Sequence, residues 1–150
     1  LITQLAWIDA ELEKKSAEQP VFCFLNVGET HVPYWYQGAP WLRWPSPCIP
    51  FGGQKCDALE SARRQRACLE WVDGKLAPLL ERFKDATVLI CADHGDCWGE
   101  DGLWEHGISH PATLTVPLLI RVRGEPVKAT NASSFRNRIF LRLQKLFRRL

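Results

Sequence analysis

Methionine is absent from the 150 residues. A complete gene product begins with methionine, so we expect this chain to be a piece of a longer protein. No apolar run approaches the roughly 18 residues of a membrane-crossing helix, which argues against a membrane span. Acidic side chains follow closely behind the first apolar residues, and this excludes a secretory signal peptide. The six cysteines form no CxxC pair, so a zinc knuckle is not expected.

What the sequence does contain is typical of a folded globular protein. Hydrophobic residues make up 46% and charged residues 24%, which excludes intrinsic disorder, and the length suits one domain or part of one. The net charge of +2 predicts no nucleic-acid partner. Basic residues nevertheless gather after residue 120, where Glu125 is the one acidic residue.

The basic end of the chain has a second pattern, because its apolar residues recur at helical spacing. We expect a basic amphipathic C-terminal helix over residues 129–150, with Phe135, Ile139, Leu143, Leu146, Phe147 and Leu150 on one side. Such a helix either packs on the body of the protein or adheres to an anionic membrane surface, and the sequence leaves both open.

Three apolar runs predict β-strands that are buried on both faces, over residues 21–27, 87–92 and 115–122. Helical periodicity covers residues 2–18 and 57–83, where Pro78 is expected to kink or split the second helix. Strand, helix and strand in this order predict an α/β fold with parallel neighbours in one sheet. A proline- and tryptophan-rich loop follows the first strand, and it either covers the core or stacks on a substrate.

Because no signal peptide is seen, we expect reduced thiols, and the location stays open with the cytoplasm favoured. Cys23 and Cys91 lie inside apolar runs and are expected to be buried thiols. Cys48 and Cys56 flank a loop that a disulfide would be able to close, so the redox state of this pair stays open.

Polar residues follow two of the predicted strands at the point where each strand ends. His31 comes soon after the first strand, and Asp93 and His94 come directly after the second. The carboxyl ends of parallel strands meet at one edge, so we expect these side chains to converge in one crevice. Carboxylate oxygen and imidazole nitrogen suit a divalent metal. Gly95 allows a sharp turn, and His106 brings a further imidazole twelve positions after His94.

These segments resemble the sulfatase and alkaline phosphatase superfamily. The similar pieces are Phe24 to Tyr34, which contains a His-x-Pro turn, then Leu69 to Leu76, then Val88 to Asp96 with Trp98 to Glu100 and His106-Gly107, and finally Val116 to Ile120. The third piece is the specific one. The resemblance implies part of an alkaline-phosphatase-like, mostly parallel sheet flanked by helices, and residues 1–128 as the carboxyl-terminal portion of a sulfatase-like catalytic domain.

The resemblance also implies roles for the site residues. Asp93 and His94 would ligate a divalent metal (Mn, Zn or Ca), and an Asp-His pair leans toward Mn or Zn. His31 and His106 would act as catalytic and substrate-binding residues by holding the oxygens of a sulfate or phosphate group. His106 would instead serve a second metal where the family uses two.

The sequence departs from the family, since it lacks both the nucleophile motif and the first acidic metal ligands that the family places near the start of the domain. We therefore expect a metal-dependent sulfate ester hydrolase that is present here as a fragment, lacks the N-terminal half of its domain and is inactive alone. A phosphate or phosphonate ester hydrolase, a phospho-group transferase and a non-catalytic anion-binding module remain as alternatives. A small sulfate or phosphate ester is the expected partner.

Overall fold

The computed structural model describes residues 1–16, 18–50 and 55–127, so the predicted helix over 129–150 lies outside the described residues. The chain divides into two compact units. Unit 1 consists of Leu1–Leu76 with Cys97–Glu105, and unit 2 consists of Ala77–Asp96 with His106–Leu150. Among the helices of the described segments, none combines the length and the hydropathy that a membrane span requires.

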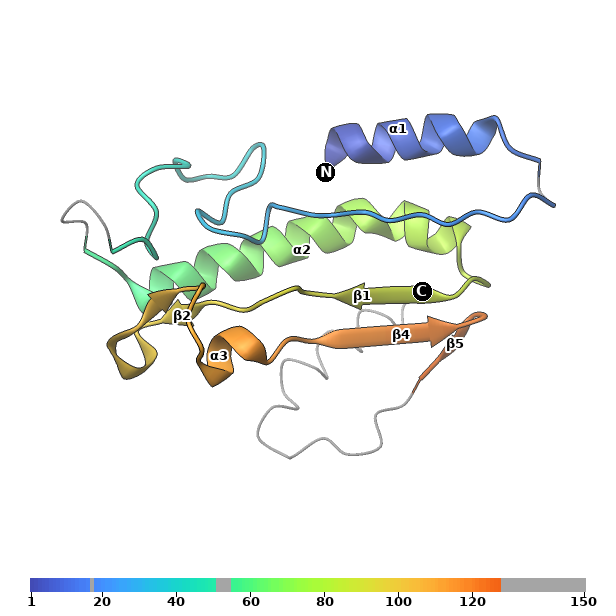
Figure 1. The fold of residues 1–150 in the computed structure, drawn as a ribbon. Coiled ribbons are helices and arrows are strands. Elements are labelled where there is room, and N and C mark those ends of the chain that lie inside the picture. The colour runs from blue at the N-terminus through green and yellow to red at the C-terminus, as the bar shows by residue number, and fades with distance from the viewer. Residues whose placement is uncertain (17, 51–54, 128–150) are drawn as a thin grey trace. The chain divides into compact units, whose positions relative to one another are not determined.

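Unit 1 contains the helix α1 (Ile2–Glu13) and most of the long helix α2 (Ala58–Arg82) (Figure 1). The α1 helix is five residues shorter than predicted. Asp57 caps α2, since its carboxylate accepts a hydrogen bond of 3.0 Å from the backbone N–H of Glu60. The expectation that Pro78 splits α2 is wrong, because the helix runs through Pro78 as one element.

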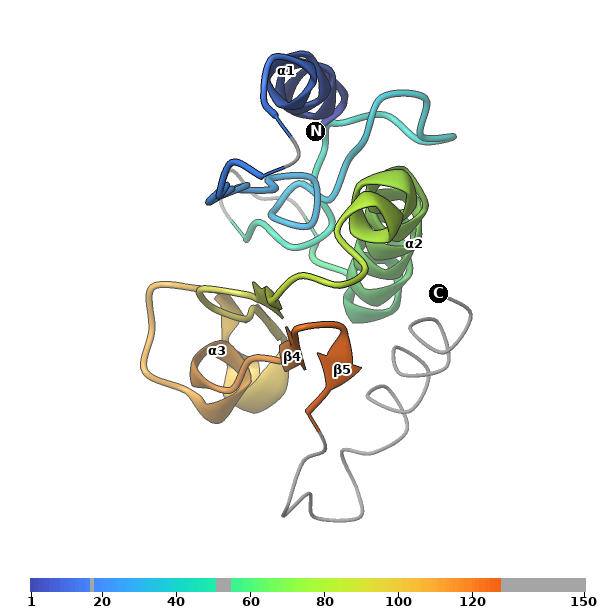
Figure 2. The same ribbon diagram turned by 90° about the vertical axis from the view of Figure 1, so that its right-hand side faces the viewer.

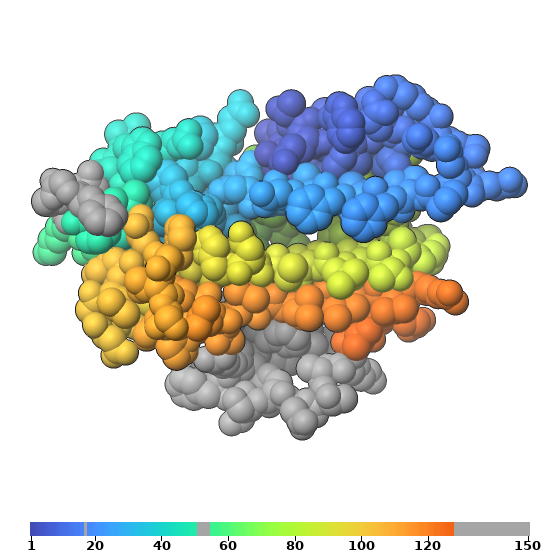
Figure 3. All heavy atoms as spheres, viewed as in Figure 1, coloured from blue at the N-terminus to red at the C-terminus, as the bar shows by residue number. Residues whose placement is uncertain are grey.

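The predicted first strand, residues 21–27, is not a strand. Its backbone runs beside α1 (Figure 1), and its atoms lie on the visible surface in the space-filling view (Figure 3). This segment and α1 line a groove of about 730 Å³. Phe22 is 93% and Phe24 82% exposed. An apolar run gives the side chains that a buried strand needs, but a strand forms only where a neighbouring backbone supplies ladder hydrogen bonds.

The core of unit 1 lies under the tryptophan-rich loop. Tyr34, Cys48 and Cys68 are fully buried there, and Trp98 donates a hydrogen bond of 2.9 Å from Nε1 to the Tyr34 hydroxyl. Tyr36 stacks on Trp71 of α2 with ring centroids 5.1 Å apart. The loop therefore covers the core. A short hairpin, β2 (Cys97–Trp98) with β3 (Trp104–Glu105), completes unit 1 around the 3₁₀ turn η2 (Glu100–Gly102).

Unit 2 contains a three-stranded sheet in the order β1 (Val88–Cys91), β4 (Leu118–Val122) and β5 (Glu125–Pro126) (Figure 2). Two of these strands lie within the predicted runs, but every pairing is antiparallel. The predicted parallel pairing across the helix is not shown, because residues 21–27 form no strand, and no described strand belongs to an alkaline-phosphatase-like parallel sheet. The molecule is a mixed α/β protein with a small antiparallel sheet.

The antiparallel return from β4 to β5 has a local cause. Arg123 and Gly124 both have positive φ, at 47° and 86°, and Val122 pairs with Glu125 across them. Two positive φ angles in a two-residue loop make the tight hairpin turn that matches the strand twist. The glycine of this turn was the sequence signal for β5 that the strand analysis did not use.

The cysteines are arranged differently from the expectation. Cys23 and Cys91 are exposed, because the first lies in the unpaired segment and the second on an open sheet face. Cys48, Cys68 and Cys97 are the buried ones, and burial raises the pKa of the Cys68 thiol to about 12. Within the described residues the cysteines form no disulfide, and the redox state of Cys48 and Cys56 stays a prediction.

Candidate functional site

The candidate site lies in unit 2, on the loop that follows β1. Gly95 holds this loop against the short helix α3 (Pro111–Leu114), since its N–H donates to the Thr113 carbonyl at 2.9 Å. A Cβ atom at position 95 would lie 2.1 Å from the Ala112 carbonyl oxygen. Only glycine fits this approach, and the fit fixes the course of the backbone between Asp93 and Asp96.

Asp93 and His94, the predicted metal ligands, are adjacent at the head of this loop. The Asp93 side chain is 90% exposed, and its Oδ1 lies 3.8 Å from Nε2 of His94. Nδ1 of His94 lies 3.0 Å from the Gly95 carbonyl oxygen. A carbonyl only accepts hydrogen bonds, so Nδ1 carries the proton, and in the neutral ring Nε2 carries the lone pair.

His106 is held by a buried carboxylate. Its Nδ1 lies 2.7 Å from Oδ1 of Asp96, whose side chain is only 3% exposed. The carboxylate accepts a hydrogen bond from Nδ1–H. The neutral His106 ring therefore has its lone pair on Nε2, and the protonated ring has an N–H there. The first form suits a metal, and the second suits an anionic oxygen.

The two imidazoles of unit 2 form one cluster. The His94 and His106 rings stack with centroids 4.1 Å apart and an interplanar angle of 28°. One ring nitrogen of each lies within 4.8 Å of a nitrogen of the other. Two histidines twelve positions apart in the sequence therefore lie together, with side chains that are 30% and 29% exposed.

The donor set fits a divalent metal. Two ligand atoms at about 2.1 Å from one ion are separated by at most about 4.2 Å, and the Asp93 oxygen and the His94 Nε2 meet this limit at 3.8 Å. The second ring nitrogen of His94 is fixed by a carbonyl, and that of His106 by a carboxylate. Metal-binding histidines are ordinarily oriented in this way.

His31 belongs to unit 1 and is exposed. Its Nδ1 lies 2.8 Å from the Val32 carbonyl oxygen, so this ring too carries its proton on Nδ1. Asp93 and His94 belong to unit 2, so the predicted convergence of His31 with them stays a prediction.

The residue that the sequence analysis missed is Asp96. The sequence indicated it only as a second acidic residue, three positions after the predicted metal ligand Asp93 and in the same loop. His110, the remaining histidine of unit 2, has a structural role here. Its Nδ1 accepts a hydrogen bond from the Ala112 N–H at 3.1 Å and so caps α3.

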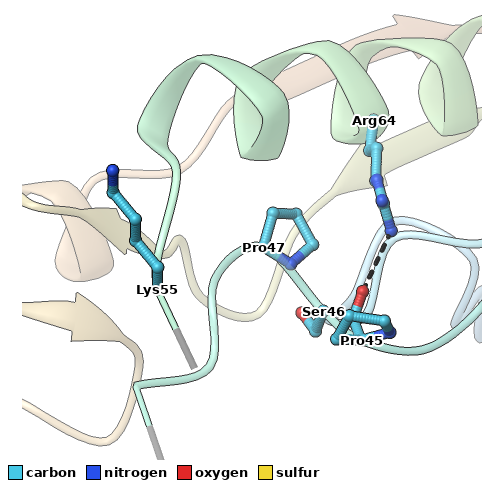
Figure 4. Close-up of a pocket in the computed structure, with 5 residues that line it drawn as sticks. All are labelled: Pro45, Ser46, Pro47, Lys55 and Arg64. Atoms are coloured by element: carbon cyan, nitrogen blue, oxygen red, sulfur yellow. Dashed lines mark hydrogen bonds between the residues drawn. The ribbon is translucent and has the colours of Figure 1, made fainter. Parts of the chain in front are cut away.

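The charged pocket of unit 1 is a weaker candidate for an anion site. It has a volume of about 360 Å³ and is lined by Pro45, Ser46, Pro47, Lys55 and Arg64 (Figure 4). The guanidinium of Arg64 already pairs with Glu60 at 2.7 Å and also donates to the Pro45 carbonyl at 3.4 Å. Of the two cationic side chains that line this pocket, Arg64 is therefore already paired within the fold.

Comparisons with known proteins show a partial relationship. Over 71 residues the chain is 34% identical to a choline-sulfatase of Rhizobium meliloti (strain 1021). The matched part makes up 41% of this chain but only 14% of the length of that protein. No family model and no solved structure matches the chain. The chain is thus similar to a sulfatase over part of its length.

Proposed function

We propose that this chain is part of a sulfatase-like, metal-dependent hydrolase of sulfate esters and that it carries one side of the active site. No residue of the chain matches the nucleophile motif of the sulfatase family, and the proposed fragment is inactive alone. The sulfate ester as substrate class rests on the similarity to a choline-sulfatase, which is partial.

One observation carries the proposal. Two imidazoles, His94 and His106, each lie beside a carboxylate, Asp93 and Asp96 respectively. His94 and His106 each have Nδ1 fixed by an acceptor, and their rings stack at 4.1 Å. A structural histidine needs no such arrangement on a partly exposed surface. A site that binds a cation and an oxyanion needs imidazoles whose tautomer is fixed. A metal ion requires a lone pair on the ring nitrogen that faces it, and an anionic oxygen requires an N–H there.

The roles follow from the donor atoms. Asp93 and His94 would hold the metal, which when bound supplies positive charge that polarises the ester group. His106, protonated on Nδ1 toward Asp96, would bind a sulfate oxygen through an Nε2–H in its protonated form. His31 would bind another oxygen of the same group. Asp96 is a positioning residue, because it acts through His106.

Calorimetric titration of the 150-residue chain with Mn²⁺ and Zn²⁺ tests the proposal. We expect one ion per chain, with affinity weakened at least about tenfold by Asp93→Asn or His94→Ala, which is the effect of losing one ligand. Asp101→Asn is the matched control, since it removes the same charge from the neighbouring turn η2. Equal affinities for wild type and both site variants would contradict the metal site.

A phosphate or phosphonate ester is the second candidate substrate. An Asp-His pair leans toward Zn or Mn rather than toward the oxygen-preferring calcium, and in this respect it resembles the phospho-transfer branches of the superfamily more than the calcium arylsulfatases. Titration of the metal-loaded chain with sulfate and with inorganic phosphate compares the two. Tighter binding of phosphate would favour the phosphate ester over the sulfate ester.

A further inference from the structure

Two cysteines of unit 1 lie where the tryptophan-rich loop returns to the start of α2. The backbone N–H of Asp57, the residue before α2, donates a hydrogen bond of 2.8 Å to the carbonyl oxygen of Pro47. Cys48 directly follows Pro47, and Cys56 directly precedes Asp57. The hydrogen bond therefore closes a ring in the chain, and the two cysteines are the first residues inside this ring on either side.

Covalent geometry limits the separation of these two cysteines. In a trans peptide a carbonyl oxygen lies about 2.8 Å from the next Cα, and an amide nitrogen lies about 2.4 Å from the preceding Cα. With the hydrogen bond of 2.8 Å between them, the Cα atoms of Cys48 and Cys56 are at most about 8 Å apart. Neither Cα lies on the line of the hydrogen bond, so the separation is shorter than this limit. Disulfides join Cα atoms that are about 4.4–6.8 Å apart, and the ring brings the pair toward this range.

The β2–β3 hairpin gives a second, independent sign that the two thiols are neighbours. The Sγ atom of Cys48 donates to the Cys97 carbonyl oxygen at 3.6 Å. Cys97 pairs with Glu105 across the hairpin. Burial and, to a smaller extent, the nearby Glu105 carboxylate raise the pKa of the Cys56 thiol. Cys48 and Cys56 therefore lie beside the two members of one cross-strand pair.

The accessibility of the thiols decides which of them reacts first. Cys48, Cys68 and Cys97 are fully buried in unit 1, whereas Cys56 is partly exposed. A small oxidant in solution reaches a thiol only where the sulfur is accessible. Cys56 is therefore the thiol that an oxidant meets in this part of the fold, and Cys48 is the thiol that the ring places beside it.

We propose that Cys48 and Cys56 form a disulfide when the protein meets a small oxidising disulfide such as glutathione disulfide. The Cys56 thiolate attacks one sulfur of glutathione disulfide and releases one glutathione. The Cys48 thiolate then attacks the Cys56 sulfur of this mixed disulfide and releases the second glutathione. The two cysteines lose two electrons and two protons, which convert the glutathione disulfide to two molecules of glutathione. The new bond joins the end of the loop to the residue next to the α2 cap.

Peptide mapping of the 150-residue chain tests this proposal. The native protein is equilibrated with excess glutathione disulfide, the remaining thiols are blocked with N-ethylmaleimide in denaturant, and the chain is digested with trypsin. Cleavage after Arg43, Lys55 and Arg63 places the two cysteines on separate peptides, 44–55 and 56–63. We expect these peptides to be joined in at least about tenfold excess over any other cysteine linkage, and to separate after reduction with dithiothreitol.

Two matched variants remove one thiol each. Cys56→Ser should abolish the linkage, and Cys23→Ser, which removes an exposed thiol of unit 1 instead, should leave it intact. In urea the hydrogen bond that closes the ring is lost, so we expect a mixture of linkages there.

Several results would overturn the proposal. One is a linkage from Cys48 to Cys97, and another is a Cys56 that stops at the mixed disulfide with glutathione. Native protein in which both thiols stay unmodified, or which gives the same mixture of linkages as the protein in urea, would overturn it as well. These results come from the wild-type chain, so they do not depend on the folding of a variant.

Discussion

Gly95 decides the geometry of the candidate site at the scale of a single residue. We expect Gly95→Ala to lower the free energy of unfolding by about 1–3 kcal/mol, because the new methyl group would lie 2.1 Å from a backbone carbonyl that cannot move alone. Urea denaturation measures the loss. Gly28→Ala is the control, since a Cβ there meets no atom within 4 Å. A loss of equal size in both variants would contradict the close packing against α3.

Asp96 fixes the tautomer of His106. We expect Asp96→Ala to convert His106 from a single tautomer with the proton on Nδ1 to a mixture, because the acceptor at 2.7 Å is lost. Long-range ¹H–¹⁵N NMR spectra of the imidazole at a pH where the ring is neutral measure this. Asp93→Ala should leave the His106 signals unchanged, since its carboxylate lies beside His94. A His106 ring that keeps one tautomer without Asp96 would refute the positioning role.

At the scale of elements, the start of α2 contains an ion-pair cluster. Glu60 accepts hydrogen bonds from Arg63 and Arg64 at 2.6–2.7 Å, and these lower the pKa of the Glu60 carboxyl to about 2 from an ordinary value of 4.5. A folded-state pKa below the unfolded one means that the pairs stabilise the fold fully above pH 4.5. This stabilisation is lost as the pH falls toward 2.

We therefore expect Glu60→Gln to destabilise the chain by about 0.5–1 kcal/mol at neutral pH, the range for partly exposed pairs. The difference from wild type should shrink between pH 4.5 and about 2. Urea denaturation across this pH range measures it. Glu70→Gln on the same helix is the control, because no ion pair of Glu70 is seen in the described structure. A Glu60→Gln effect that is constant with pH would refute the ion-pair explanation.

Elements were predictable where their signal is local. The apolar periodicity predicted α2 to within one residue at each end, and two of the three apolar runs contain β1 and β4. The remaining run, residues 21–27, is similarly apolar, but it pairs with no strand in the described structure. Composition indicates that a segment suits a buried strand. Which strand it pairs with, and whether the pair is parallel or antiparallel, depends on segments that are distant in the sequence.

At the scale of the whole molecule, the chain has metal-ligand and anion-binding side chains but no residue that matches the family's nucleophile motif. We expect the purified 150-residue chain to show no turnover of an aryl sulfate or aryl phosphate, with or without added Mn²⁺ or Zn²⁺. A spectrophotometric assay of the released phenol measures this. Turnover that disappears in His94→Ala would overturn the fragment interpretation, and an intact metal affinity in the same preparation is the control for folding.

The sequence by itself determined which residues are candidates for the site. Asp93, His94 and His106 stand out because acids, imidazoles and glycines gather after an apolar run, and this signal needs no coordinates. Only the tertiary structure decided that Asp96 is buried against His106 and that Gly95 packs under α3. It also decided that the sheet of unit 2 is antiparallel with one face open. These features depend on contacts between segments that lie far apart in the chain, and a linear pattern does not encode such contacts.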